Sequence, residues 1–106
     1  MKTFTYNKLI RDKNVEVIEK LGHKAEFRIM DDDEYANELD KKLLEESNEF
    51  LEAHDTEELA DLLEVIYSIA KFKKIDLNEV EQKRIAKRNR KGGFDEKIYL
   101  KTVTEN

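Results

Sequence analysis

The sequence predicts a mainly α-helical protein built around an antiparallel helical hairpin. Apolar residues recur at intervals of three and four through the middle of the chain, a spacing typical of amphipathic helices. The chain has no proline, and acidic capping residues stand before three of the predicted helices. Its 106 residues are enough for one domain, residues 1–106, and not for two. We therefore expect a single helical domain.

The N-terminal part is predicted to hold little regular structure. Residues 1–13 read as an irregular or extended arm. Asn14 can cap a short helix, and Gly22 lies where a glycine commonly ends one. Polar and apolar residues alternate over 24–30, which predicts a strand.

The central part is predicted to form two helices. The first begins after the aspartates at 31–33 and runs to about His54. Asp55 and Glu58 have the spacing of a capping box, which indicates a break and a new helix start. The second helix, over 59–70, is more apolar, and we expect it to be the central and most buried one.

The C-terminal part is predicted to begin with a basic helix. Asp76 caps this helix, which ends near Arg90 before the glycines at 92–93. In the tail, residues 94–106, the stretch 97–103 could form a second strand. It would pair with the first strand, because a lone strand leaves its backbone groups without partners.

The amino-acid composition excludes several classes of protein and favours others. Charged residues make up 42% of the chain and apolar ones 39%, and the long apolar stripes exceed what one hairpin can cover, which favours a homo-oligomer. The absence of cysteine excludes thiol catalysis and disulfides, and two histidines give little support to a histidine-based site. No apolar run approaches the roughly 20 residues of a membrane span. The first residues lack the apolar core of a secretory signal, so we expect a cytoplasmic protein with no membrane partner.

Two pairs of acidic residues carry the main chemical signal. Glu46 and Glu49 lie three residues apart, as do Glu58 and Asp61, so each pair shares a helical face. Residues that face each other across an antiparallel hairpin have position numbers with a constant sum. Glu49 with Glu58 and Glu46 with Asp61 meet this condition. The four carboxylates are therefore expected to converge on one patch.

Such a patch calls for a compensating charge. Two like charges 4 Å apart cost about 4 kcal/mol at an effective dielectric constant of 20, so either the pKa values rise or a cation neutralises the group. Oxygen-only ligands favour Mg²⁺, with Mn²⁺ as a possible substitute, and such an ion can hold a polyphosphate and activate water. The alternative is that these acids form a solvated helix face.

Basic residues form two further candidate groups for phosphate binding. One lies in the arm at Lys8, Arg11 and Lys13. The other lies along the basic helix at Lys83, Lys87, Arg88, Arg90 and Lys91. Cations near a helix C-terminus also favour the helix dipole, which is the alternative reading. A nucleic-acid partner is not expected, because the net charge is −5 and the strongest basic run is confined to one helix.

Four motifs give a family resemblance that covers nearly the whole chain. The sequence KLLEESNEF followed by EELADLLEVI resembles the EExxE…ExxD signature of the MazG-like, all-α nucleotide pyrophosphohydrolases. YNKLIRDK near the start and KRNRKGGF near the end resemble the ends of a small single-domain branch related to phosphoribosyl-ATP pyrophosphohydrolase. That branch usually has a proline soon after RDK, whereas Val15 follows Asn14 here.

The resemblance implies a helical bundle that assembles as a dimer or a dimer of dimers. It implies Mg²⁺ bound by Glu46, Glu49, Glu58 and Asp61, with Glu45 near the metal or the water. Glu45, Glu46 and Glu49 are then the candidate catalytic residues. The implied reaction is hydrolysis of a nucleoside triphosphate to the monophosphate and pyrophosphate, and clearing surplus or non-standard nucleotides is one role that such a reaction can serve. Candidate phosphate contacts by position are Lys83, Lys87, Arg88 and Lys91.

Two alternatives remain open at this stage. One is the narrower enzyme, phosphoribosyl-ATP pyrophosphohydrolase. The other is a non-catalytic helical interaction module, whose acidic residues would serve solubility or a basic partner.

Overall fold

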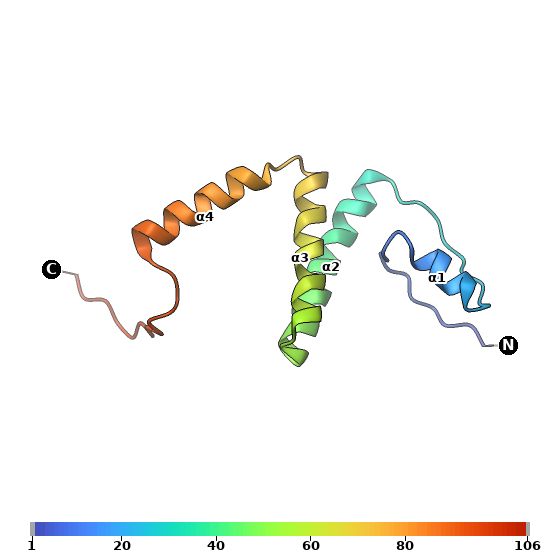
Figure 1. Ribbon diagram of the computed structural model, residues 1–106, viewed down its shortest axis with the longest axis horizontal. Coiled ribbons are helices and arrows are strands. Elements are labelled where there is room, and N and C mark those ends of the chain that lie inside the picture. Colours follow the sequence, from blue (N-terminus) through green and yellow to red (C-terminus); the bar gives the residue numbers. More distant parts are fainter. Residues whose placement is uncertain (1, 106) are drawn as a thin grey trace. The chain divides into compact units, whose positions relative to one another are not determined.

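The computed structural model describes residues 2–105, and the regular secondary structure in this part of the chain is all α-helical (Figure 1). The helices are α1 (Asn14–Lys20), α2 (Asp32–Ala53), α3 (Thr56–Phe72) and α4 (Leu77–Lys91). The mainly α class is thus confirmed. The chain falls into two compact units, one up to Lys74 and one from Ile75 onward, and each is described by itself.

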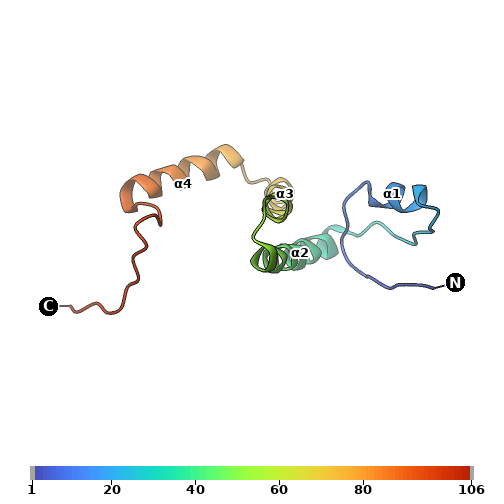
Figure 2. The same ribbon diagram turned by 60° about the horizontal axis from the view of Figure 1, so that its bottom comes forward.

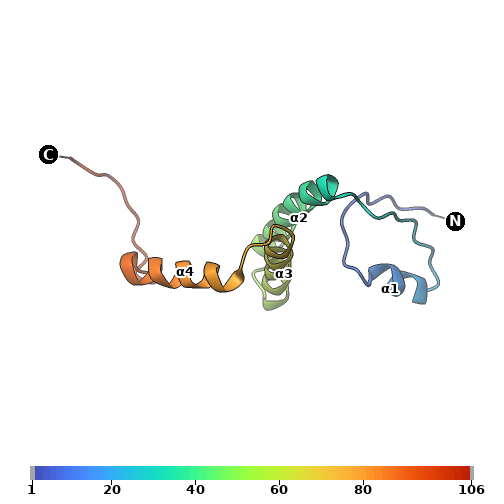
Figure 3. The same cartoon turned by 90° about the horizontal axis from the view of Figure 1, so that it is seen from above.

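The first unit is organised around a hairpin of α2 and α3, which lie side by side in Figure 1, Figure 2 and Figure 3. Tyr35, near the start of α2, meets Phe72, the last residue of α3, with ring centroids 5.0 Å apart and planes at 86°. The helices therefore run in opposite directions. Leu39, Val65 and Ala70 are the buried apolar residues of this seam. The antiparallel hairpin is as the sequence predicts.

Local capping sets the ends of the hairpin helices. The Asp31 carboxylate accepts a hydrogen bond from the Glu34 backbone N–H at 2.9 Å, and Asp55 accepts one from the Glu58 N–H at the same distance. Each satisfies a donor that the first helical turn leaves free. His54 ends α2 in the left-handed conformation, with φ of 53°. The predicted break therefore falls at His54 and Asp55.

The first helix differs from the prediction at its start. Asn14 is the first helical residue, and Lys13 is the N-cap, without a side-chain capping bond. The Asn14 N–H donates instead to the Arg11 carbonyl at 3.0 Å, so a turn of the arm leads directly into α1. Gly22 follows the helix with φ of 85°, a conformation that glycine adopts without strain.

Neither predicted strand forms in the part of the chain that the structure describes. Residues 24–30 and 97–103 are both irregular. The first stretch belongs to the first unit and the second stretch to the other unit. Alternation of polar and apolar residues cannot make a strand when no neighbouring backbone supplies the hydrogen bonds. Arg28 instead donates two bonds of 2.6 Å to the carboxylate of Glu34.

The second unit consists of α4 and the tail. The Asp76 side chain accepts from the Asn78 N–H at 2.8 Å, so it caps the helix without the reciprocal bond of a capping box. The helix ends one residue later than predicted, and Gly92 follows with φ of 84°. None of its described residues is buried.

The helix α3 is less buried than predicted. In the single chain only Val65 and Ala70 of α3 are buried. An apolar stripe, made of Leu59, Leu63, Ile66 and Tyr67, remains 42% to 51% exposed. α2 covers only one side of α3, so the predicted central position is not shown, although α3 has two buried residues among 17, against two among 22 in α2 and none in α1 or α4. Within residues 2–105, no helix is both long enough and apolar enough to cross a membrane.

Candidate functional site

The predicted carboxylates come together across the hairpin. Two overlapping groups can each offer oxygens that all lie within 4.8 Å of one another. One group comes from α2 alone, and the other joins α2 to α3. The five members form what we call the acidic cluster: Glu45, Glu46 and Glu49 on α2, with Glu58 and Asp61 on α3. Glu46 belongs to both groups, so it lies at the centre of the cluster.

Two oxygens of the acidic cluster are buried without a hydrogen-bond partner. Glu46 is only 8% exposed, and its Oε2 atom has no partner among the described residues. The same is true of Oε2 of Glu58. The other oxygen of Glu46, Oε1, lies 3.6 Å from Nζ of Lys42. A buried polar atom left unpaired is costly, and such atoms in proteins are normally paired with a protein group, a water or an ion.

The cluster raises the pKa of two of its carboxyl groups. Burial is the largest cause for Glu46, followed by the side-chain hydrogen bond and negative charge of Glu49, while Lys42 acts in the opposite direction. Burial also leads for Glu58, whose pKa is raised further by Glu49 and Asp61. Carboxylates held this close favour the protonated form, or a cation that neutralises them.

The N-terminal arm supplies positive charge to the same cluster. Nζ of Lys8 lies 2.9 Å from Oε1 of Glu45, and this hydrogen bond lowers the pKa of Glu45 and raises that of Lys8. A nitrogen of the Arg11 guanidinium group lies 2.8 Å from Oδ1 of Asp61. Two of the three arm residues proposed from the sequence as phosphate contacts, Lys8 and Arg11, are thus located at the acidic cluster.

Lys42 is a member of the site that the sequence analysis missed. Its ammonium group lies 3.4 Å from Glu45 and 3.6 Å from Glu46. Its position three and four residues before these acids on α2 was the available signal, because such pairs meet on one helix face.

The basic residues of α4 belong to the second unit. There Lys83 pairs with Glu79 at 3.4 Å, and Arg88 lies 3.7 Å from Asp95. The first of these is an ordinary ion pair of an exposed helix face. A role of Lys83, Lys87, Arg88 and Lys91 in phosphate binding stays a prediction.

Comparisons with protein-family models, curated proteins and solved structures found no match to this chain. The family resemblance therefore rests on the sequence motifs alone.

The raised pKa values predict an unusual dependence of stability on pH. In the folded protein the pKa values of Glu46 and Glu58 are raised above the ordinary 4.5. At a pH between 4.5 and the raised pKa, the folded protein therefore binds more protons than the unfolded chain. Without divalent cations, Tm is expected to rise as the pH is lowered from neutral toward 4.5, because the folded protein takes up protons on these two groups before the unfolded chain does. At lower pH it should fall, because Glu45 has a lowered pKa and loses its stabilising charge. Thermal melts followed by circular dichroism in chelator measure this.

The matched variants for this experiment are Glu46→Gln and Glu64→Gln. Glutamine at position 46 should flatten the rise, because it removes a titrating group of the cluster. Glu64 is exposed on α3 and outside the cluster, so its variant should keep the wild-type profile. A wild-type Tm that falls steadily from pH 7 downward would contradict the assignment.

Proposed function

We propose that this protein is a Mg²⁺-dependent nucleotide pyrophosphohydrolase of the MazG-like type. One observation carries the proposal: two helices bring five carboxylates together, and two of the carboxylate oxygens are buried without a partner. The family motifs recognised in the sequence agree with this reading.

The donor set of the acidic cluster fits a hard divalent cation. All its potential ligands are carboxylate oxygens, which suit Mg²⁺ or Mn²⁺ better than zinc. A cation bound by Glu46, Glu49, Glu58 and Asp61 would satisfy the two buried oxygens and offset the mutual repulsion. Mg²⁺ commonly keeps several waters and bridges to substrate phosphates, so the site need not enclose it.

The proposed reaction converts a nucleoside triphosphate and water into the monophosphate and pyrophosphate. The oxygen of water bonds to the α-phosphorus while the bond from this phosphorus to the α–β bridging oxygen breaks. Pyrophosphate leaves, and a proton of the water passes to a carboxylate. When bound, Mg²⁺ would neutralise phosphate charge and acidify the water. Glu45 is the carboxylate we assign to accept the proton, because the other four acids of the cluster are assigned to the cation.

Lys8 and Arg11 are the residues best placed to bind the phosphates. Both already contact acids of the cluster, at 2.9 and 2.8 Å. A triphosphate arriving with its cation would offer these side chains new anionic partners, while the carboxylates they release would take up the cation. Arginine and lysine bind phosphate oxygens through charge-assisted hydrogen bonds.

We also propose that the chain assembles with copies of itself, as a homodimer or a dimer of dimers. The apolar stripe of α3 supports this, because four large side chains remain substantially exposed along one helix. A monomer rarely leaves such a contiguous patch uncovered. Packing of the stripes would complete a helical bundle around the hairpins.

The proposed function is tested by measuring pyrophosphate release from a panel of nucleoside triphosphates and from phosphoribosyl-ATP. With Mg²⁺, at least one nucleotide should turn over at about 1–10 per second, and chelation should abolish the release. Preference for phosphoribosyl-ATP would assign the narrower enzyme. If no nucleotide is cleaved, and calorimetry detects neither Mg²⁺ nor a non-hydrolysable triphosphate, the proposal fails in favour of the interaction module.

A further inference from the structure

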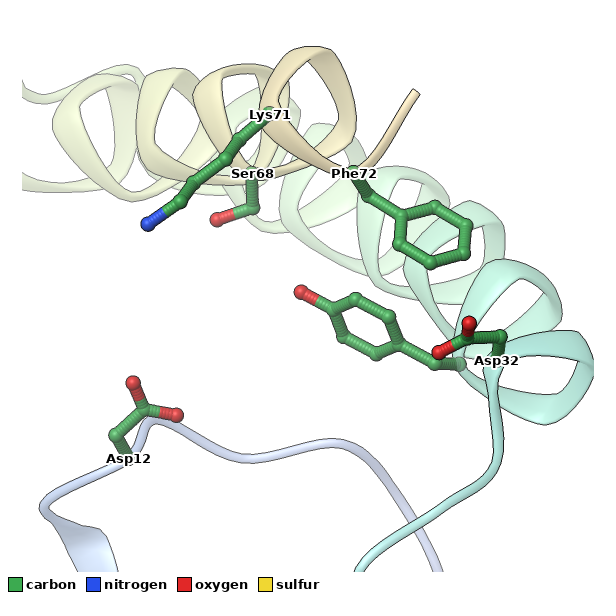
Figure 4. A pocket seen from close by; sticks show the side chains of 6 residues that line it. Asp12, Asp32, Ser68, Lys71 and Phe72 are labelled. Carbon is green, nitrogen blue, oxygen red and sulfur yellow. The ribbon is translucent and has the colours of Figure 1, made fainter. Parts of the chain in front are cut away.

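A cavity of about 500 Å³ lies at the end of the hairpin opposite the His54 turn (Figure 4). The arm, the start of α2 and the end of α3 line it. Its lining residues are Asp12, Asp32, Tyr35, Ser68, Lys71 and Phe72. All of them belong to the first unit. The volume falls within the range usual for small-molecule sites, and the pocket is widely open to solvent.

The walls of this cavity differ in chemistry. Tyr35 and Phe72 form an edge-to-face aromatic pair that gives one wall an apolar surface. Lys71 and Ser68 offer hydrogen-bond donors from α3, and Figure 4 shows Asp12 across the opening from them. Within residues 2–105, the side chains of Asp12, Ser68 and Lys71 have no hydrogen bond or ion pair with another residue. These groups are therefore free to meet a ligand.

The cavity and the acidic cluster follow one face of the hairpin. Ser68 lies seven residues after Asp61 on α3, which is two helical turns on the same face and about 10 Å along the axis. The N-terminal arm also links the cavity to the acidic cluster. Asp12 lines the cavity, and the residue before it, Arg11, is paired with Asp61 of the cluster. One extended molecule could thus reach both places.

We propose that this cavity binds the nucleoside half of the substrate while its phosphates lie at the acidic cluster, an inference that rests on the proposed function. A nucleobase is flat and carries both donors and acceptors, which match the aromatic pair and the mixed polar groups. The hydroxyl groups of a sugar can donate to the carboxylates of Asp12 and Asp32. A free anion fits poorly, because those two carboxylates would repel it.

The proposal is tested with two variants and a control. Ser68→Trp fills the cavity, and Lys71→Met removes its ammonium group. Each should raise KM for the nucleoside triphosphate about tenfold, the effect of losing one charged hydrogen bond or the equivalent contact. The inhibition constant of inorganic tripolyphosphate, which has phosphates but no nucleoside, should change less than about twofold. Lys41→Met, at an exposed lysine of α2, should alter neither value.

An equal rise in KM for the nucleotide and in the inhibition constant of tripolyphosphate would overturn the proposal, because the variants would then act through the acidic cluster. An unchanged KM in both variants would overturn it as well. If the wild type cleaves no nucleotide, the proposed function fails separately. Amide NMR during titration with uncharged nucleosides then shows whether the cavity binds a nucleoside. Shifts at Tyr35, Ser68 and Lys71 that Ser68→Trp abolishes would support it, and their absence would overturn it.

Discussion

Asp61→Asn is expected to reduce Mg²⁺-dependent pyrophosphate release about a thousandfold, which corresponds to about 4 kcal/mol of transition-state stabilisation. The amide is neutral and a poorer ligand for Mg²⁺ than a carboxylate. The substitution also weakens the contact with Arg11, which at present spans 2.8 Å. Glu49→Gln should have a similar effect, because Glu49 belongs to one ligand group and acts on the pKa values of Glu46 and Glu58.

The measurement is the initial rate of pyrophosphate release at saturating Mg²⁺ and nucleotide. Glu64→Gln is the matched control, since it removes an exposed carboxylate from α3 outside the acidic cluster, and it should retain nearly full activity. Circular dichroism checks that each variant folds. Unchanged turnover in both Asp61→Asn and Glu49→Gln would remove the proposed site.

The double substitution Leu63→Asp with Ile66→Asp is expected to convert an oligomer of this chain into monomers. Burying one large apolar side chain stabilises an interface by about 1.5–3 kcal/mol, and a buried unpaired carboxylate adds a further cost. Both residues lie in the apolar stripe of α3, at 44% and 42% exposure in the single chain. The mass measured by light scattering should fall to that of one chain, 12.6 kDa.

The control for this experiment is Ile98→Asp, which introduces the same carboxylate in the tail. Ile98 is 81% exposed. It should leave the wild-type mass unchanged. A wild type that is monomeric at every accessible concentration would contradict the assembly proposal. So would an oligomer that survives both substitutions in the stripe, since its interface would then lie elsewhere.

The features that the sequence could predict depend on neighbours along the chain. Asp31 and Asp55 cap helices because each side chain reaches the N–H three residues ahead. The convergence of Glu46 with Asp61 followed from helical spacing and the position of one turn. These interactions join residues that are close in the sequence, so residue type and spacing are enough to predict them.

The features that the sequence could not predict depend on partners distant in the chain. The alternating stretch at 24–30 has the composition of a strand, but pairing requires a second backbone that it does not find. The cavity joins Asp12 to Lys71, which are far apart in sequence. The helical pattern of α3 marks Ile66 as apolar but does not say which of its apolar positions a neighbour covers, and α2 leaves Ile66 42% exposed.

The short link between α2 and α3 has a consequence for the variation that this hairpin can accept. The left-handed residue His54 and the capping residue Asp55 are all that separates the two helices. One residue inserted into a helix between the acids and this link would turn the acids beyond it by about 100° about the helix axis. Many single replacements at exposed positions outside the apolar stripe should therefore be harmless, whereas a change of length by one residue near the link would disperse the carboxylates.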